Sequence, residues 1–190
     1  MNDIDTQVER AYKYLESGGV ILYPTDTIWG IGCDATDPKA IEKIKAIKGR
    51  SQDKSFIVLL PSWESISWYV KNISPQLKWV YNQFTRPTTI VFDQAINLPA
   101  ELLNQDSSVA IRIPQDDFCI KLLDKLGKPI VSTSANTSWS PSPQNFSEIE
   151  TSIINKVDHV VDYKRDDMTT HTPSRIIKVD DNGDIVVIRD

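Results

Sequence analysis

Hydroxyl and acidic side chains follow directly after a short apolar run near the start of the chain. The run Val20–Tyr23 ends at Pro24, and the triplet Thr25, Asp26 and Thr27 comes next. Hydroxyl groups and exposed backbone N–H groups at the end of a strand suit recognition of a carboxylate or a phosphate. The same residue types also close ordinary turns by bonding to their own backbone. This motif alone leaves both interpretations open.

Three cations form a second cluster, at the end of a predicted helix. Lys48 and Arg50 flank Gly49, and Lys54 follows shortly after them. Arg binds a phosphate through two parallel N–H···O hydrogen bonds, and Lys acts as a point charge. This set of cations therefore suits a polyphosphate. Cations in the last turn of a helix also stabilise its dipole, and glycine commonly ends a helix. The cluster is therefore consistent with either role.

A third polar stretch, Ser132–Ser138, follows the apolar run Pro129–Val131. Its hydroxyls and one amide are neutral donors and acceptors that suit a ribose, a phosphate or a carboxylate. A nucleophilic serine would need a neighbouring base, and neither His159 nor His171 lies in a recognisable triad context. The G-x-S-x-G pattern is absent as well, which argues against a serine hydrolase.

Single cations complete the candidate chemistry. Arg112 interrupts the apolar run Val109–Ile113, and it points either to solvent or into a polar site. Ser174 begins the last predicted hairpin, and Arg189 ends it. The two histidines and two cysteines have no metal-ligand spacing, so we expect no fixed metal site.

Composition limits the class of protein. The chain has 190 residues, of which 40% are hydrophobic and 25% charged, which is typical of one soluble globular domain. Its 21 basic and 26 acidic residues give a net charge of -5, which disfavours a globally basic nucleic-acid binder but permits a local basic groove. Two cysteines, a polar N-terminus and the lack of a long apolar run predict a cytoplasmic protein without a membrane span.

Hydrophobic periodicity and turn residues predict alternating helices and strands. Helices are expected over 5–17, 38–48, 118–126 and near 147–154, with two short ones within 62–83. Strands are expected over 20–23, 56–60, 88–92, 109–113, 129–131 and 157–161, with a terminal hairpin from 174–179 and 185–188. This order predicts an α/β fold with α+β-like antiparallel pairs, in which a twisted mixed sheet is flanked by helices. Sites in such folds lie where strands end.

Taken together, the motifs resemble those of the YrdC-like threonylcarbamoyl-AMP synthase family. The resemblance runs from Ile4 to Arg189 and rests on Y-P-T-D-T-I-W-G-I-G-C-D-A at 23–35, I-K-G-R at 47–50 with D-K-S-F after it, P-T-T-I-V at 87–91, V-A-I-R-I-P at 109–114, P-I-V-S-T-S-A-N-T-S at 129–138, P-S-R-I-I at 173–177 and I-R at 188–189. Each motif is weak alone, but their order and spacing are specific. The match is to the short type, in which residues 1–190 form a single YrdC-like domain with a large concave cavity.

The resemblance implies an L-threonylcarbamoyladenylate synthase, a nucleotidyltransferase. Its substrates would be L-threonine, bicarbonate or CO₂, and ATP accompanied by Mg²⁺, and its products threonylcarbamoyl-AMP and pyrophosphate. The adenylate would pass to the transferase machinery that makes t⁶A at tRNA position 37. Many members of the family bind double-stranded RNA or tRNA. Because this chain has a net negative charge, we expect RNA to be a possible rather than a required ligand.

The resemblance also assigns roles to positions of this sequence. It implies catalytic importance for Lys48, Arg50, Ser134 and Asn136. ATP contacts would come from Arg50, Lys54, Ser108, Ser134, Ser142 and Arg189, and threonine contacts from Thr27, Leu59, Arg112, Ser132 and Ser174. Arg112 would pair with the threonine carboxylate.

Some positions depart from the family pattern, namely Trp29, Arg86, Trp139 and Arg175. They affect the expected cavity shape and fine specificity more than the class of ligand. The alternative is a non-catalytic paralogue that binds RNA, tRNA or the ribosome, and the retained K-x-R and S-x-N motifs argue against it. A carbamoyl-transfer domain of hydrogenase maturation proteins is disfavoured because this chain lacks their cysteine clusters.

Overall fold

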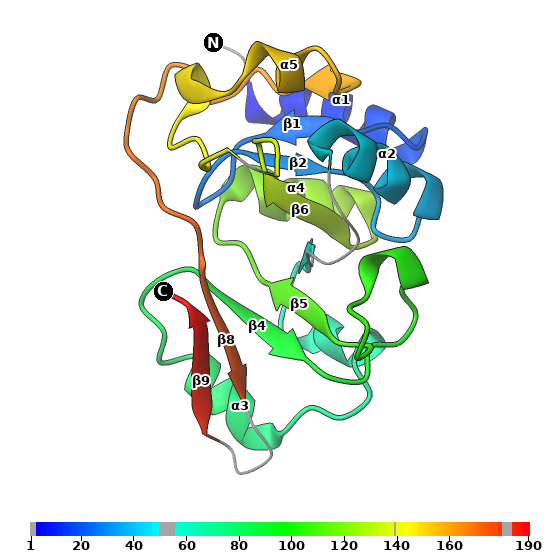
Figure 1. The fold of residues 1–190 in the computed structure, drawn as a ribbon, viewed down its shortest axis with the longest axis vertical. Coiled ribbons are helices and arrows are strands. Elements are labelled where there is room, and N and C mark those ends of the chain that lie inside the picture. Colours follow the sequence, from blue (N-terminus) through cyan, green and yellow to red (C-terminus); the bar gives the residue numbers. More distant parts are fainter. Residues whose placement is uncertain (1–2, 50–55, 139, 180–183) are drawn as a thin grey trace.

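The structure is a computed structural model of the chain, and it describes residues 3–49, 56–138, 140–179 and 184–190. Its described strands form one mixed sheet of nine strands in the order β7-β1-β2-β6-β3-β5-β4-β8-β9 (Figure 1). The strands are β1 (Ile21–Tyr23), β2 (Gly30–Gly32), β3 (Ile57–Leu59), β4 (Thr88–Phe92), β5 (Val109–Arg112), β6 (Ile130–Ser134), β7 (His159–Val160), β8 (Arg175–Val179) and β9 (Ile185–Arg189). The predicted α/β fold with a mixed sheet is confirmed.

The helices connect and cover this sheet. The α-helices are α1 (Ile4–Glu16), α2 (Pro38–Lys48), α3 (Pro75–Tyr81), α4 (Asp117–Leu126) and α5 (Thr151–Ile154). Short 3₁₀ helices occur at Glu64–Trp68, Ala100–Leu102 and Phe146–Glu148. The first of the two short helices expected within 62–83 is thus a 3₁₀ helix, and the one near 147–154 is split in two.

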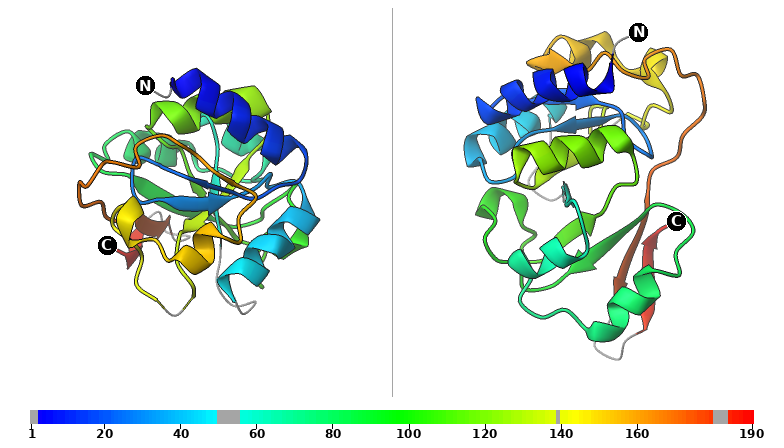
Figure 2. Two further views of the ribbon diagram at one scale, coloured as in Figure 1. Left: turned by 90° about the horizontal axis from the view of Figure 1, so that it is seen from above. Right: turned by 180° about the vertical axis from the view of Figure 1, so that it is seen from behind.

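Alternation along β1 divides the core between the two faces of the sheet. Ile21 and Tyr23 pack in one cluster with α1 and α4, whereas Leu22 packs in the other with α2. Successive side chains of a strand point to opposite faces, so three apolar residues in a row serve both layers. Figure 2 shows α1 and α4 side by side on one side of the sheet.

Helix α2 begins and ends where the sequence predicts. The Asp37 carboxylate accepts hydrogen bonds from the backbone N–H groups of Lys39 and Ala40, and Pro38 fills the first turn. Gly49 ends the helix with a φ of 56°, a left-handed conformation that glycine adopts without steric cost. This termination fixes Lys48 as the last residue of the helix.

Strand β2 was not expected, because its sequence Gly30-Ile31-Gly32 has no run of β-branched residues. The glycines are needed for packing: a Cβ on Gly32 would lie 2.4 Å from the Val131 oxygen and 2.7 Å from the Tyr23 ring. Strand β6 is also longer than predicted. Its polar end reaches Ser134 because Thr133 and Ser134 pair with β2, so tertiary pairing extends the strand beyond its apolar residues.

Candidate functional site

One cavity of about 340 Å³ lies where the ends of several elements meet. It is lined by residues from the β1–β2 region (Thr27, Ile28, Trp29, Gly30), α2 (Lys48), β3 (Ile57), β5 (Arg112), β6 (Ser132, Thr133, Ser134), the following loop (Asn136, Ser138, Ser140, Ser142), the approach to β8 and its start (Pro173, Ser174, Ile176) and β9 (Arg189). Hydroxyl groups and cations predominate among the polar side chains on this wall. The cavity therefore suits anionic, oxygen-rich ligands.

Lys48 holds the loop after β6 against the end of α2. Its side chain is buried, and its Nζ donates to the backbone oxygens of Ser134 at 2.5 Å and Asn136 at 2.6 Å. In return, the Lys48 carbonyl accepts a hydrogen bond from the Ser138 N–H at 3.0 Å. The predicted catalytic cation is thus also the residue that fixes the S-x-N loop.

Asn136 extends this bracing along the loop. Its side-chain amide donates to the carbonyl oxygens of Thr137 at 2.9 Å and Ser140 at 2.5 Å. The Thr137 and Ser140 hydroxyls lie 2.9 Å apart. Because these bonds close the loop on itself, Ser140 is held at the cavity wall.

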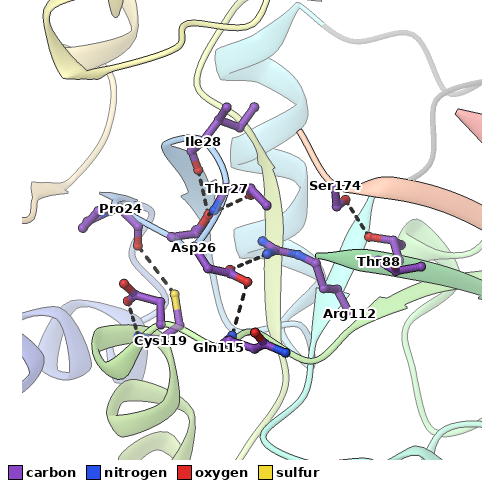
Figure 3. Close-up of polar contacts among 12 residues, drawn as sticks. Pro24, Asp26, Thr27, Ile28, Thr88, Arg112, Gln115, Cys119 and Ser174 are labelled. Carbon is purple, nitrogen blue, oxygen red and sulfur yellow. Dashed lines mark hydrogen bonds and ion pairs between the residues drawn. The ribbon is translucent and has the colours of Figure 1, made fainter. Parts of the chain in front are cut away.

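Arg112 ends β5 and is almost fully buried, with 4% of its side chain exposed. Its Nη1 lies 2.5 Å from the Asp26 Oδ1, as Figure 3 shows. The other carboxylate oxygen of Asp26 accepts the Gln115 N–H at 3.3 Å. Asp26 therefore ties the β1–β2 loop to the end of β5, and the charge inside that strand has a partner within the protein.

The neighbours of the Thr27 hydroxyl determine the direction in which it donates its hydrogen bond. Thr25 Oγ1 donates to the Ile28 carbonyl at 2.8 Å and lies 2.9 Å from Thr27 Oγ1. A hydroxyl has one hydrogen, so the Thr27 hydroxyl must donate to Thr25. The oxygen of Thr27 is left as an acceptor at the cavity wall, where it suits an ammonium or hydroxyl group.

Arg189 and Ser174 meet at the cavity wall. The Arg189 guanidinium donates to the Ser174 carbonyl through Nη2 at 2.7 Å and Nε at 3.2 Å. The Ser174 hydroxyl lies 2.8 Å from the Thr89 hydroxyl. Burial lowers the pKa of Arg189, and the nearby positive charge of Arg112 lowers it further. The positive charges of these two guanidinium groups therefore repel each other.

The cavity brings together most of the residues that the resemblance singled out. They are Thr27, Lys48, Arg112, Ser132, Ser134, Asn136, Ser142, Ser174 and Arg189. Arg50, Lys54 and Trp139 lie outside the described residues. Among the described lining residues, Leu59 and Ser108 do not occur.

These two residues have other surroundings. Leu59 is fully buried in the core cluster of α1 and α4. Ser108 precedes β5, at the opposite end from Arg112, and its hydroxyl accepts a hydrogen bond from the Asn104 amide at 2.8 Å.

Asp26 and Ser140 are site residues that have no specific role in the predictions from the sequence. Asp26 has one signal in the sequence, since it is a carboxylate between two threonines at a strand end. Ser140 has none, because its position depends on the bonds that Asn136 makes. Across the described ranges, no group of three or more His, Cys, Asp or Glu residues could hold a metal ion. No helix within them is long and apolar enough to cross a membrane.

Comparison with known proteins identifies relatives over nearly the whole chain. The Sua5/YciO/YrdC family model, described as "Telomere recombination", matches residues 13–190. A threonylcarbamoyl-AMP synthase of Coxiella burnetii is 29% identical over 163 residues, which cover 85% of this chain and 88% of that protein. A protein of the same name from Vibrio campbellii is 31% identical over 145 residues, which cover 75% of this chain and 78% of that protein.

Solved structures share the fold. E. coli YciO superposes with a TM-score of 0.82 at 25% identity, over 96% of this chain and 88% of that one. Sua5 of P. abyssi, solved in complex with L-threonine, superposes with a TM-score of 0.86 at 24% identity. That alignment covers 98% of this chain but only 54% of the archaeal one, so this chain spans about half of its length.

Proposed function

This chain belongs to the Sua5/YciO/YrdC family, and on that premise we propose that it is an L-threonylcarbamoyladenylate synthase. The observation that carries the proposal is the polar cavity of about 340 Å³ described above. It gathers side chains from Thr27 to Arg189 that the family resemblance assigns to threonine and ATP. Such a set is scattered along the sequence and converges only in the fold.

The proposed reaction joins three substrates in two steps. The threonine amine attacks CO₂ and loses a proton, which gives a carbamate. A carbamate oxygen then attacks the α-phosphorus of ATP, the bond to the bridging oxygen of the β-phosphate breaks, and pyrophosphate leaves. This second step is a nucleotidyl transfer and needs no covalent intermediate with the protein.

Charge is the main obstacle in this reaction, because an anionic carbamate must approach a polyphosphate. Lys48, Arg112 and Arg189 all line the cavity and provide positive charge there. Lys48 and Arg112 are buried, and buried cations stabilise developing negative charge more strongly than exposed ones, since water screens them less. Their positions at the ends of α2, β5 and β9 also align the two reacting groups, which lowers the entropic cost of the encounter.

In this proposal threonine and ATP bind at different ends of the cavity. The acceptor oxygen of Thr27 and the guanidinium of Arg112 suit the amine or hydroxyl and the carboxylate of threonine. Ser134, Ser142 and Arg189 suit the nucleotide, with Arg50 and Lys54 as further predicted contacts. Arg189 contacts Ser174, a predicted threonine contact, so the two ends adjoin at this pair. Ser132 completes the threonine end.

ATP would enter as its Mg²⁺ complex, and the adenylate would be passed to a t⁶A-forming transferase. RNA or tRNA binding remains an optional part of the proposal. Both cysteines, Cys33 and Cys119, are free and buried, which supports the proposed cytoplasmic location.

Incubation of the purified protein with MgATP, bicarbonate and L-threonine tests the proposal directly. We expect pyrophosphate release together with an adenylate that contains threonine, detected by mass spectrometry. Omission of threonine or bicarbonate should abolish both products. Pyrophosphate release that continues unchanged without threonine would contradict the proposal, as would salt-dependent tRNA binding with no turnover.

A further inference from the structure

Asp26 is a buried carboxylate placed directly behind a cation of the cavity. Its side chain is 12% exposed, and its Oδ1 lies 2.5 Å from Nη1 of Arg112. Arg112 and Thr27 belong to the described wall of the cavity, whereas Asp26 does not. Figure 3 shows the carboxylate between the β1–β2 loop and the end of β5. Asp26 therefore acts on a ligand through Arg112 rather than by touching it.

The ion pair makes the two arginines of the cavity unequal. Arg112 has a carboxylate partner, while the guanidinium of Arg189 donates hydrogen bonds to Ser174. A polyphosphate carries several negative charges and would be drawn to a cavity guanidinium that has no carboxylate beside it, as in the described contacts of Arg189. Beside Arg112 it would also meet the negative charge of Asp26. The nucleotide phosphates are thus favoured at the Arg189 end.

An amino acid responds differently to the same pair. A zwitterion has no net charge, so it gains from a site in which positive and negative groups lie side by side. Arg112 keeps donors for a ligand carboxylate, because Asp26 takes only Nη1 and the Nε is buried with no hydrogen-bond partner. The second Asp26 bond, from the Gln115 N–H, fixes the carboxylate and with it the guanidinium.

We propose that Asp26 is a positioning and specificity-determining residue, which orients Arg112 and offsets its charge so that this end of the cavity accepts an amino-acid carboxylate and rejects polyphosphate. This inference rests on the proposed function for the identity of the amino acid. The charge partition itself rests on the ion pair of Arg112 with Asp26 and on the described contacts of Arg189, which go to Ser174.

The substitution Asp26→Asn keeps the shape of the side chain and removes its charge. We expect the dissociation constant for inorganic triphosphate to fall about tenfold, because Arg112 then attracts phosphate without an opposing charge. We expect the dissociation constant for L-threonine to rise about tenfold, because Arg112 loses its fixed orientation. Isothermal titration calorimetry with each ligand measures both constants. A merely structural defect would weaken both ligands, so the opposite signs identify the proposed role.

Asp34→Asn is the matched control. Asp34 is equally a buried carboxylate with a cationic partner, since its Oδ2 lies 2.6 Å from Nζ of Lys128, but it is absent from the described cavity wall. We expect this variant to bind both ligands as the wild type does. Asp26→Glu serves as a second test and covers the case in which Asp26→Asn does not fold. It keeps the charge and moves it, so triphosphate affinity should stay unchanged while threonine affinity falls.

The proposal is overturned if Asp26→Asn leaves triphosphate affinity unchanged or weaker, or if Asp26→Glu binds triphosphate more tightly than the wild type. Failure of the proposed function has a different signature. In that case the wild type shows no threonine-dependent pyrophosphate release, while the triphosphate comparison between wild type and variants can still be made.

Discussion

Lys48 and Asn136 lie 88 residues apart in the sequence, yet the Lys48 Nζ donates to the Asn136 backbone oxygen at 2.6 Å and lies 3.4 Å from its side-chain oxygen. The contact joins the end of α2 to the loop after β6. One lysine therefore supplies charge to the cavity and also determines the shape of the loop that carries several of its hydroxyl groups.

Lys48→Ala is expected to lower the rate of threonine-dependent pyrophosphate release by at least about a hundredfold. It removes a buried charge at the cavity and three hydrogen bonds to the S-x-N loop. Steady-state assays with MgATP, bicarbonate and threonine measure the effect. Lys45→Ala is the control, since Lys45 lies in the same last turn but pairs with the exposed Glu42. Equal losses in both variants would argue against a specific role for Lys48.

Arg189→Ala is expected to raise the KM for ATP about tenfold, with a smaller effect on the KM for threonine. The substitution removes a cavity cation, whose loss leaves the phosphates with less compensating charge. Initial rates at varied ATP and varied threonine separate the two constants. Lys178→Ala is the control, since Lys178 lies on β8, next to β9, and pairs with the exposed Asp93. It should leave the KM for ATP and the KM for threonine unchanged. A larger change in the threonine constant would reverse the proposed assignment of Arg189.

Gly32→Ala is expected to destabilise the fold by about 2–4 kcal/mol, because the new methyl would overlap the Val131 backbone oxygen and the buried Tyr23 ring. Urea unfolding followed by circular dichroism measures the change. Gly127→Ala provides the comparison: its φ of 64° disfavours alanine, but no atom lies within 4 Å of the added Cβ. It should cost about 1–2 kcal/mol. A larger loss for Gly127→Ala would contradict the packing role of Gly32.

His159 should make stability fall as the solution becomes acidic. Burial lowers the pKa of this histidine in the folded protein, and the positive charges of Arg165 and Arg10 lower it further. The unfolded chain therefore binds more protons below the ordinary histidine pKa of about 6.5, so stability is lost as the pH falls through that value toward the folded pKa.

His159→Phe tests this effect, because phenylalanine can keep the stacking on Tyr14, whose ring centroid is 4.6 Å from that of His159. Free energies of unfolding are compared at about pH 7.5 and pH 5.5. The variant should lose less stability than the wild type over this interval. An identical loss in both proteins would exclude His159 as a source of the pH dependence.

Much of the local structure could be predicted because its causes are local. In α2 the Asp37 cap, Pro38 and Gly49 define the ends, and apolar spacing defines the buried face. Most of the site residues that the ordered motifs singled out also line the cavity. Strand β2 escaped prediction because its glycines are explained only by the neighbouring Tyr23 and Val131.

The sequence by itself determined the boundaries of α2, the alternating α/β pattern and the residue types available for binding anions. The tertiary structure decided which of these residues meet. Asp26 and Arg112 are 86 residues apart, and nothing in the composition or periodicity of either segment specifies their ion pair. Helix caps and apolar spacing depend on neighbours within a few residues, whereas this pair depends on the register of the whole sheet. The charge balance of the cavity is therefore a property of the fold.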